Sequence, residues 1–254
     1  MAAKYDGGHF LRKPQFSGQF VPPFYGGMEV NVEKIVLVGA GGHALSVIDS
    51  IRSKEEYEII GITELGCTVG EQVSGCEIMG NDSILKSVFD SGVKYAFIAV
   101  GSVGSTALRE KLYHLLKDTG FILPAIIDNS SNIGSDVCLG AGIYAGKNTV
   151  VNAKSTIRDM AIINTGAIIE HGCRVNEFAH IGPGAVICGD VKIGAGTHVG
   201  ANTTIIQGVT IGYNSIIGAG STVVHDVPSK VIAYGNPCKV VRNKESGRSQ
   251  GTVL

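Results

Sequence analysis

Between residues 133 and 223, every sixth position of the chain carries an apolar side chain. Sixteen consecutive positions follow this rule, and all but Ala145 are large aliphatic residues. Neither an α-helix, with a period of about 3.6 residues, nor a strand, with a period of about two, produces this spacing. The positions are Ile133, Leu139, Ala145, Val151, Ile157, Ile163, Ile169, Val175, Ile181, Ile187, Ile193, Val199, Ile205, Ile211, Ile217 and Val223.

A solenoid whose coils have three flat faces accounts for the period of six. Each hexapeptide forms one face and points one aliphatic side chain at the axis, so about five coils of about 18 residues stack on one another. Burial of each such side chain stabilises the fold by roughly 1.5–3 kcal/mol before the loss of chain entropy is counted. Glycine or asparagine often follows the aliphatic residue, as at Gly182 and Asn164. We expect it to take the positive φ that a corner demands.

A different pattern occupies the residues before the solenoid, where short apolar runs alternate with amphipathic segments. The apolar side of the first helix is expected to consist of Leu45, Val47, Ile48 and Ile51. Gly120 is expected to cap the last helix in the left-handed conformation. Such alternation predicts a parallel sheet with helical crossovers. Strands are expected at 35–38, 57–62 and 95–100, and helices after residue 43, at 82–89 and at 105–119.

The formal net charge is only −1, from 21 basic and 22 acidic side chains. The chain therefore lacks the basic excess with which a dedicated nucleic-acid-binding protein neutralises phosphates. No run approaches the roughly 20 apolar residues of a membrane span, and no secretory signal is evident. The six cysteines form no CxxC pair. These features predict a cytoplasmic protein with reduced thiols and no membrane or nucleic-acid partner.

Four motifs together resemble a known group of enzymes: residues 38–43 (VGAGGH), 168–171 (IIEH), 178–184 (FAHIGPG) and 235–239 (GNPCK). The sequence is similar, over residues 33–242, to bacterial hexapeptide-repeat sugar acetyltransferases. These include the sialic-acid O-acetyltransferase type and the N-acetyltransferases of UDP- or GDP-linked 4-amino sugars. The resemblance implies a Rossmann-like parallel sheet followed by a left-handed parallel β-helix. It also implies a homotrimer that binds acetyl-CoA between neighbouring β-helices.

The expected organisation has four segments. Residues 1–32 are expected to be a flexible extension or leader, because their apolar residues follow neither the helix period nor the strand period. Residues 33–123 form the Rossmann-like sugar-nucleotide-binding domain, and residues 124–242 form the β-helix acyltransferase domain. The polar residues 243–254 are expected to be a disordered tail.

Acetyl transfer to an amine requires a base, donors to the developing oxyanion, and alignment of the reactants. His171 lies two residues past the inward-facing Ile169, so it should project outside the coil near a corner, and the resemblance makes it the general base. The resemblance likewise assigns acetyl-CoA contacts to His180 and Gly189. Gly189 stands one coil beyond His171 at the same register, where its backbone N–H could donate to the thioester oxygen.

One departure from the family concerns the residue after the base. An acidic residue commonly follows the catalytic histidine in the resembling enzymes, whereas Gly172 follows it here. Glu170, or Glu177 from a neighbouring coil or subunit, is a candidate to orient the ring, and His171 acting alone is the alternative.

The glycines after the first strand suit the approach of a diphosphate to a helix N-terminus. The complete GxGxxG spacing is absent because Ala44 is the sixth residue, so a nicotinamide cofactor is not predicted. Ligands of such sheets bind beyond the carboxyl ends of strands. The expected contacts to the sugar nucleotide at this edge are Gly39, Gly41, Gly42, Gly101 and Ser102. The resemblance adds His43, near the sugar nucleotide, and Glu64, at a position where acidic residues usually read the nucleotide base.

Metal chemistry and a cysteine nucleophile are not predicted. His180 and His198 are 18 residues apart and should stack, but with His171 they lack the closely paired histidine spacing of hexapeptide-repeat carbonic anhydrases. Cys173 and Cys188 have no assigned base.

The sequence thus predicts an acetyl-CoA-dependent N-acetyltransferase acting directly on a nucleotide-linked 4-amino sugar. The alternatives are an O-acetyltransferase on sialic acid or another sugar hydroxyl, and a non-catalytic sugar-nucleotide-binding scaffold.

Overall fold

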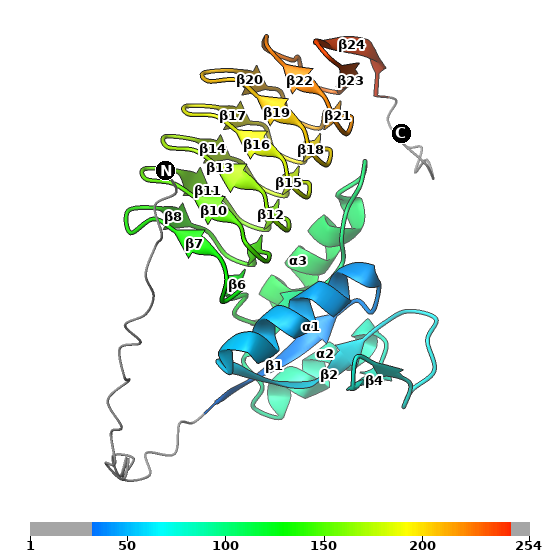
Figure 1. Ribbon diagram of the computed structural model, residues 1–254. Coiled ribbons are helices and arrows are strands. Elements are labelled where there is room, and N and C mark those ends of the chain that lie inside the picture. The colour runs from blue at the N-terminus through cyan, green and yellow to red at the C-terminus, as the bar shows by residue number, and fades with distance from the viewer. Residues whose placement is uncertain (1–31, 245–254) are drawn as a thin grey trace, which may run out of the picture. The chain divides into compact units, whose positions relative to one another are not determined.

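The computed structural model describes residues 32–244 (Figure 1). The expected N-terminal extension lies outside the described residues except for Val32, and so does the expected C-terminal tail except for Asn243 and Lys244.

A five-stranded sheet forms the first part of the described chain, in the order β3-β4-β2-β1-β5. Parallel pairing joins β1 (Glu33–Val38) to β2 (Tyr57–Thr63) and to β5 (Tyr95–Ile98). The strand β4 (Cys76–Gly80) continues the parallel order beside β2, and the short β3 (Gln72–Val73) runs antiparallel to β4. The predicted parallel sheet is confirmed.

Helices cover both faces of this sheet, because successive residues of its central strands point to opposite sides. Helix α1 (Gly42–Lys54) packs on the face that carries Ile35 and Leu37. Helices α2 (Leu85–Asp90) and α3 (Ala107–Thr119) pack on the face that carries Val36 and Val38. A 3₁₀ turn, η1 (Asp82–Ile84), precedes α2. Gly120 caps α3 in the left-handed conformation, as predicted.

Leu45 departs from the prediction, because half of it is exposed. The residues of α1 that face the sheet are Ala44, Val47, Ile48 and Ile51, at the spacing i, i+3, i+4, i+7. Leu45 falls outside this stripe and therefore cannot reach the same core.

Three sheets form the walls of the β-helix, and their strands are parallel and 18 residues apart in the sequence except at the C-terminal end of the third sheet, whose last strand is antiparallel. The first comprises β7 (Asn132–Ile133), β10 (Val150–Val151), β13 (Ile168–Ile169), β16 (Val186–Ile187), β19 (Thr204–Ile205) and β22 (Thr222–Val223). The second comprises β8 (Cys138–Leu139), β11 (Thr156–Ile157), β14 (Arg174–Val175), β17 (Lys192–Ile193) and β20 (Thr210–Ile211). The third comprises β6 (Ile126–Ile127), β9 (Tyr144–Ala145), β12 (Ile162–Ile163), β15 (His180–Ile181), β18 (His198–Val199), β21 (Ile216–Ile217), β23 (Val231–Gly235) and β24 (Cys238–Asn243).

The sixfold aliphatic positions fill the axis of this prism. Ile169 pairs in register with Ile187, and Ile187 with Ile205, so the three side chains stack directly. Nearly all sixteen positions are buried; Ile133 and Leu139 are more exposed because they lie in the first coil. The predicted hexapeptide β-helix is confirmed.

The explanation proposed for the glycines and asparagines after the aliphatic residues was wrong. Positive φ occurs three residues after every one of these positions from Leu139 to Ile217, for example at Gly184 and Asn202. Gly182, directly after Ile181, has no positive φ, and a Cβ there would come within 2.7 Å of the Val199 carbonyl oxygen in the next coil. Close stacking of the coils therefore selects glycine at this position.

The register predicts a contrast between the two residues of β17. Replacing the fully buried Ile193 with alanine should lower the free energy of unfolding by about 2–5 kcal/mol, because it leaves a cavity in the axis. Replacing its exposed neighbour Lys192 with alanine should change it by less than about 0.5 kcal/mol. Denaturant titration of both variants measures this difference, and equal losses would contradict the inward register.

Candidate functional site

The loop between β1 and α1 contains three glycines that play different structural roles. Gly39 has φ +103°, and a Cβ on it would overlap the Val100 side chain, so the fold itself requires glycine there. A Cβ on Gly41 or on Gly42 would meet no atom within 4 Å. Both are exposed at the N-terminus of α1, where free backbone N–H groups and the helix dipole favour an anion.

Glu64 shapes this loop. Its Oε2 accepts a hydrogen bond from the Ala40 backbone N–H at 2.7 Å, and its Oε1 accepts one from the Leu65 backbone N–H at 2.8 Å. Both carboxylate oxygens thus hold backbone amides at the end of β2, so Glu64 orders the loop as well as lying beside it.

The loop after β5 joins the α/β part to the β-helix through His180. The Ser102 carbonyl lies 2.8 Å from His180 Nδ1, and the Asn164 amide nitrogen lies 3.2 Å from Nε2. A carbonyl can only accept, so Nδ1–H donates and Nε2 accepts from the amide, which defines a neutral tautomer. A Cβ on Gly101 would lie 3.5 Å from His43 Cβ, so Gly101, Ser102, His43 and His180 form one neighbourhood.

Burial keeps the histidines of this neighbourhood neutral. It lowers the pKa of His43 to about 3, with further lowering by His180 and Arg109. It also lowers the pKa of His180. The centroids of the His180 and His198 rings lie 4.9 Å apart, edge to face. Burial lowers the pKa of His198 to about 3, with a smaller electrostatic contribution from His180. Within residues 32–244, no three potential ligands gather closely enough to hold a metal ion.

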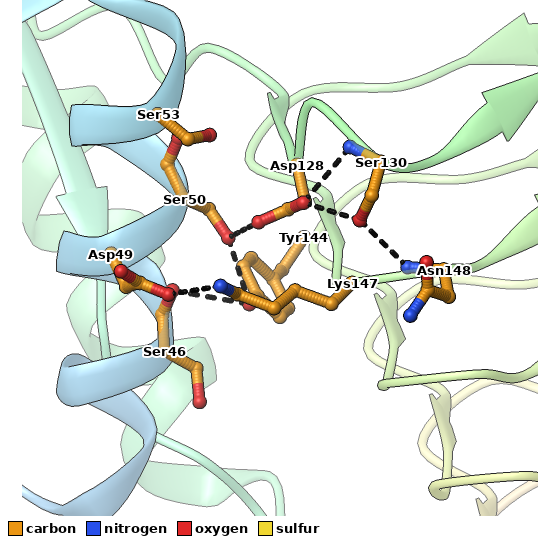
Figure 2. Close-up of polar contacts among 9 residues, drawn as sticks. All are labelled: Ser46, Asp49, Ser50, Ser53, Asp128, Ser130, Tyr144, Lys147 and Asn148. Atoms are coloured by element: carbon orange, nitrogen blue, oxygen red, sulfur yellow. Dashed lines mark hydrogen bonds and ion pairs between the residues drawn. The ribbon is translucent and has the colours of Figure 1, made fainter.

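Polar contacts fix α1 on the β-helix (Figure 2). Ser50 Oγ donates to Asp128 Oδ2 at 2.6 Å and lies 3.2 Å from the Tyr144 hydroxyl. Lys147 Nζ lies 2.5 Å from Asp49 Oδ2. These contacts join the helix that carries the glycine loop to the first coils of the solenoid. Sequence analysis did not single out these residues, because serine and aspartate on a helix usually lie on its solvent-exposed face.

A cleft of about 340 Å³ opens beside this contact, between α1 and a corner of the β-helix. Leu45, the residue that sequence analysis placed in the core, lines it. The other lining residues are Ser46, Asp49, Ser74, Tyr144, Lys147 and Thr165.

His171 lies at a different corner, directly after β13, and its side chain is exposed as expected. Its ring covers Gly189 of the next coil, where a Cβ would come 2.6 Å from Cε1 and 2.7 Å from Nε2. The His171 carbonyl accepts the Asp190 backbone N–H at 2.9 Å. Among the described residues, the backbone N–H of Gly189 has no hydrogen-bond acceptor. An exposed imidazole and a free amide donor therefore share this corner.

The two candidate orienting residues have different surroundings. Glu177 Oε1 accepts from Arg158 at 3.2 Å, and both residues belong to another corner of the prism. Glu170 directly precedes His171, and its side chain is half-buried. Cys173 is buried, and burial raises the pKa of its thiol to about 11, which disfavours the thiolate that a nucleophile needs.

Within one chain, the predicted residues thus form two groups. The glycine loop, Glu64, His43, Gly101, Ser102 and His180 lie where the α/β part meets the third sheet. His171 and Gly189 lie at a corner beside the first sheet. Arg109, whose guanidinium donates to the Met160 carbonyl at 2.5 Å, is a further buried member of the first group that sequence analysis missed.

The buried histidines predict a pH-dependent stability. The unfolded chain takes up a proton on His198 near pH 6.5, whereas the folded chain does so only near pH 3, so stability is complete above about pH 6.5 and falls as the pH decreases towards about 3. A His198→Gln variant should therefore show a shallower fall in melting temperature between about pH 7.5 and about pH 5 than the wild type. The matched control is His114→Gln, at an exposed position of α3, which should retain the wild-type slope. Identical slopes for all three proteins would contradict this effect of burial.

Known protein families match both the α/β part and the β-helix of the chain. Residues 34–116 match the family described as PglD N-terminal domain. Residues 173–207 and 190–225 match the bacterial transferase hexapeptide family, described as six repeats. No helix within residues 32–244 combines the length and apolar character that a membrane crossing requires.

Solved structures share the whole architecture. A perosamine N-acetyltransferase from Caulobacter crescentus, a histidine variant in complex with CoA and GDP-perosamine, is 36% identical, with a TM-score of 0.79 over 84% of this chain and 98% of that chain. The acetyltransferase domain of PglB from Neisseria gonorrhoeae, in complex with acetyl coenzyme A, is 28% identical. Its TM-score is 0.75 over 82% of this chain and 99% of that chain. WeeI from Acinetobacter baumannii, at 23% identity and a TM-score of 0.71, shares the fold.

The 36% identity extends over nearly the full length of the perosamine enzyme, and both family matches fall on the corresponding parts of the fold. The chain therefore belongs to the hexapeptide-repeat sugar acetyltransferases with a PglD-type N-terminal domain, which are acetyl-CoA-dependent enzymes.

Proposed function

We propose that the protein transfers the acetyl group of acetyl-CoA to the amine of a nucleotide-linked 4-amino sugar, with His171 as the general base. The observation that carries this proposal is the exposed His171 ring lying over the Gly189 backbone, whose amide is free to donate. The two structures that contain GDP-perosamine or acetyl coenzyme A support a nucleotide-linked amino sugar as acceptor and acetyl-CoA as donor.

The reaction proceeds by direct transfer. The amine nitrogen forms a bond to the thioester carbonyl carbon while His171 takes the proton that this nitrogen loses. The Gly189 N–H donates to the carbonyl oxygen while it carries negative charge. Collapse of this intermediate breaks the carbon–sulfur bond, and the CoA thiolate takes up the proton held on His171. No acyl-enzyme is required, in agreement with the protonated state that burial favours for Cys173.

The acceptor nucleotide is proposed to bind at the glycine loop. Gly41 and Gly42 leave the backbone open to a diphosphate, and Glu64 keeps that loop in shape. His43, Gly101 and Ser102 line the adjoining surface, and His180 links it to the β-helix. A neutral His180 suits contact with acetyl-CoA better than a cation would, because it presents no buried charge.

A homotrimer is part of this proposal, and the division of roles within one chain supports it. The loop and the base lie at different places on one chain, so in the proposed assembly the base of one copy acts on a sugar held by another. Acetyl-CoA would then lie in the groove between two β-helices.

Substitution of the base should abolish most turnover. His171→Ala should lower kcat about 10²–10⁴-fold, the range typical of lost general-base catalysis, while CoA binding measured by calorimetry persists. His114→Ala, on the surface of α3, is the matched control and should retain wild-type kcat. Wild-type turnover by His171→Ala would refute the role of this histidine.

An acceptor panel distinguishes the alternatives. UDP-, GDP- and dTDP-linked 4-amino sugars are compared with sialic acid while release of the CoA thiol is followed. Turnover on a 4-amino sugar supports N-acetylation, turnover on sialic acid alone supports the O-acetyltransferase, and no thiol release with any acceptor supports the scaffold.

The open backbone of the glycine loop predicts a separate effect on the acceptor. Gly42→Ala fits the helix and should keep or raise the melting temperature, because alanine favours a helix by up to about 1 kcal/mol. Its methyl group would hinder the diphosphate, so KM for the sugar nucleotide should rise about tenfold or more, while KM for acetyl-CoA stays unchanged. An unchanged KM for the sugar nucleotide would place that ligand elsewhere.

A further inference from the structure

The coils that carry His171 and Asp190 interlock at their shared corner. The His171 ring occupies the space above Gly189, and a Cβ on Gly172 would overlap Asp190 Oδ1. Each coil thus places a side chain where the other has a glycine. The backbone bond from the Asp190 N–H to the His171 carbonyl, 2.9 Å long, holds the two residues in this arrangement.

The same geometry recurs at two other corners, but with a neutral side chain. A Cβ on Gly184 would overlap Asn202 Oδ1, and a Cβ on Gly196 would overlap Asn214 Oδ1. Both asparagines have a positive φ close to that of Asp190, which is 60°. An amide therefore fulfils the structural role of this corner, so the charge of Asp190 is not needed for folding.

Other charged groups at the corner do not replace this carboxylate. Glu170 directly precedes His171, and its side chain is half-buried. Lys154 stands one coil before Gly172 at the same register, and its backbone N–H donates to Asp136 Oδ1 at 3.2 Å. Cys173 and Cys188 also lie close to this corner, and the Cys173 thiol donates to the Cys188 carbonyl.

We propose that Asp190 is the positioning residue of His171, supplying from the next coil the negative charge that Gly172 does not supply. This inference rests on the proposed function of His171 as the base. The Asp190 carboxylate lies against Gly172, the neighbour of His171 in the sequence, and the His171 ring lies over Gly189, the neighbour of Asp190. The proposed contribution of Asp190 is to the positive charge that develops on the ring across this shared corner. A nearby negative charge favours the imidazolium that forms when the amine is deprotonated.

Asp190→Asn tests this role, because asparagine is the residue that the fold uses at the equivalent corners. Its melting temperature should stay within about 2 °C of the wild type. Its kcat should fall about tenfold, because the carboxylate no longer stabilises the imidazolium that forms in the transition state, while KM for acetyl-CoA stays within about twofold. Asn214→Asp, the reverse change at another corner, is the control and should leave kcat unchanged.

A rescue variant separates charge from shape. In the double variant Gly172→Asp with Asp190→Gly, the two facing residues exchange places, so the carboxylate returns to the corner from the other coil. Aspartate tolerates the left-handed backbone better than most residues, so the corner should still form. This variant should recover at least about a third of the wild-type kcat.

The outcomes distinguish this inference from the proposed function. If His171→Ala is inactive while Asp190→Asn keeps the wild-type kcat, Asp190 has no positioning role and the base assignment stands. If Asp190→Asn loses activity only in proportion to folded protein, or the exchanged variant stays as slow as Asp190→Asn, the role is structural and the inference fails. Full activity of His171→Ala would overturn the proposed function itself.

Discussion

The structure depends on one constraint, the stacking of aliphatic side chains at every sixth position along a common axis. Ile169, Ile187 and Ile205 pair in register, and this alignment fixes every other residue of their coils relative to the coil above. A residue two places past Ile169 must then lie against a residue two places past Ile187. The contact between His171 and Gly189 is therefore a consequence of core packing, and the candidate catalytic corner inherits its geometry from the hydrophobic axis.

The same stacking explains why glycine is so frequent here and why it serves two purposes. Directly after an aliphatic residue, glycine avoids a clash with the backbone of the next coil, as at Gly182. Three residues after it, a positive φ is required, but asparagine, aspartate, lysine, methionine and phenylalanine also adopt it in this chain. At Gly172 both demands act together, because φ is +69° and the Asp190 carboxylate fills the space beside it.

Much of the fold was predictable because its two periods are explicit in the sequence. The register of the aliphatic residues, the parallel sheet and the cap at Gly120 were predicted and are confirmed. Contacts between residues distant in sequence were not predictable: Ser102 meets His180 only because the α/β part docks on the third sheet. Leu45 was wrongly assigned to the core because the prediction relied on its apolar side chain. Its position on the helix lies outside the buried face of α1. The roles of His171, Gly189 and the glycine loop stay predictions.

The claim on which the enzymatic account depends is that the base of one copy serves the sugar site of another. Mixed oligomers test it directly, by coexpressing His171→Ala chains with chains that carry Gly42→Trp, each type with its own affinity tag. Each parent should be inactive alone, since one lacks the base and the other blocks the glycine loop. The account predicts that oligomers purified through both tags recover acetyl transfer, because some interfaces pair an intact base with an intact loop. Tagged mixed oligomers that remain as inactive as their parents would contradict it.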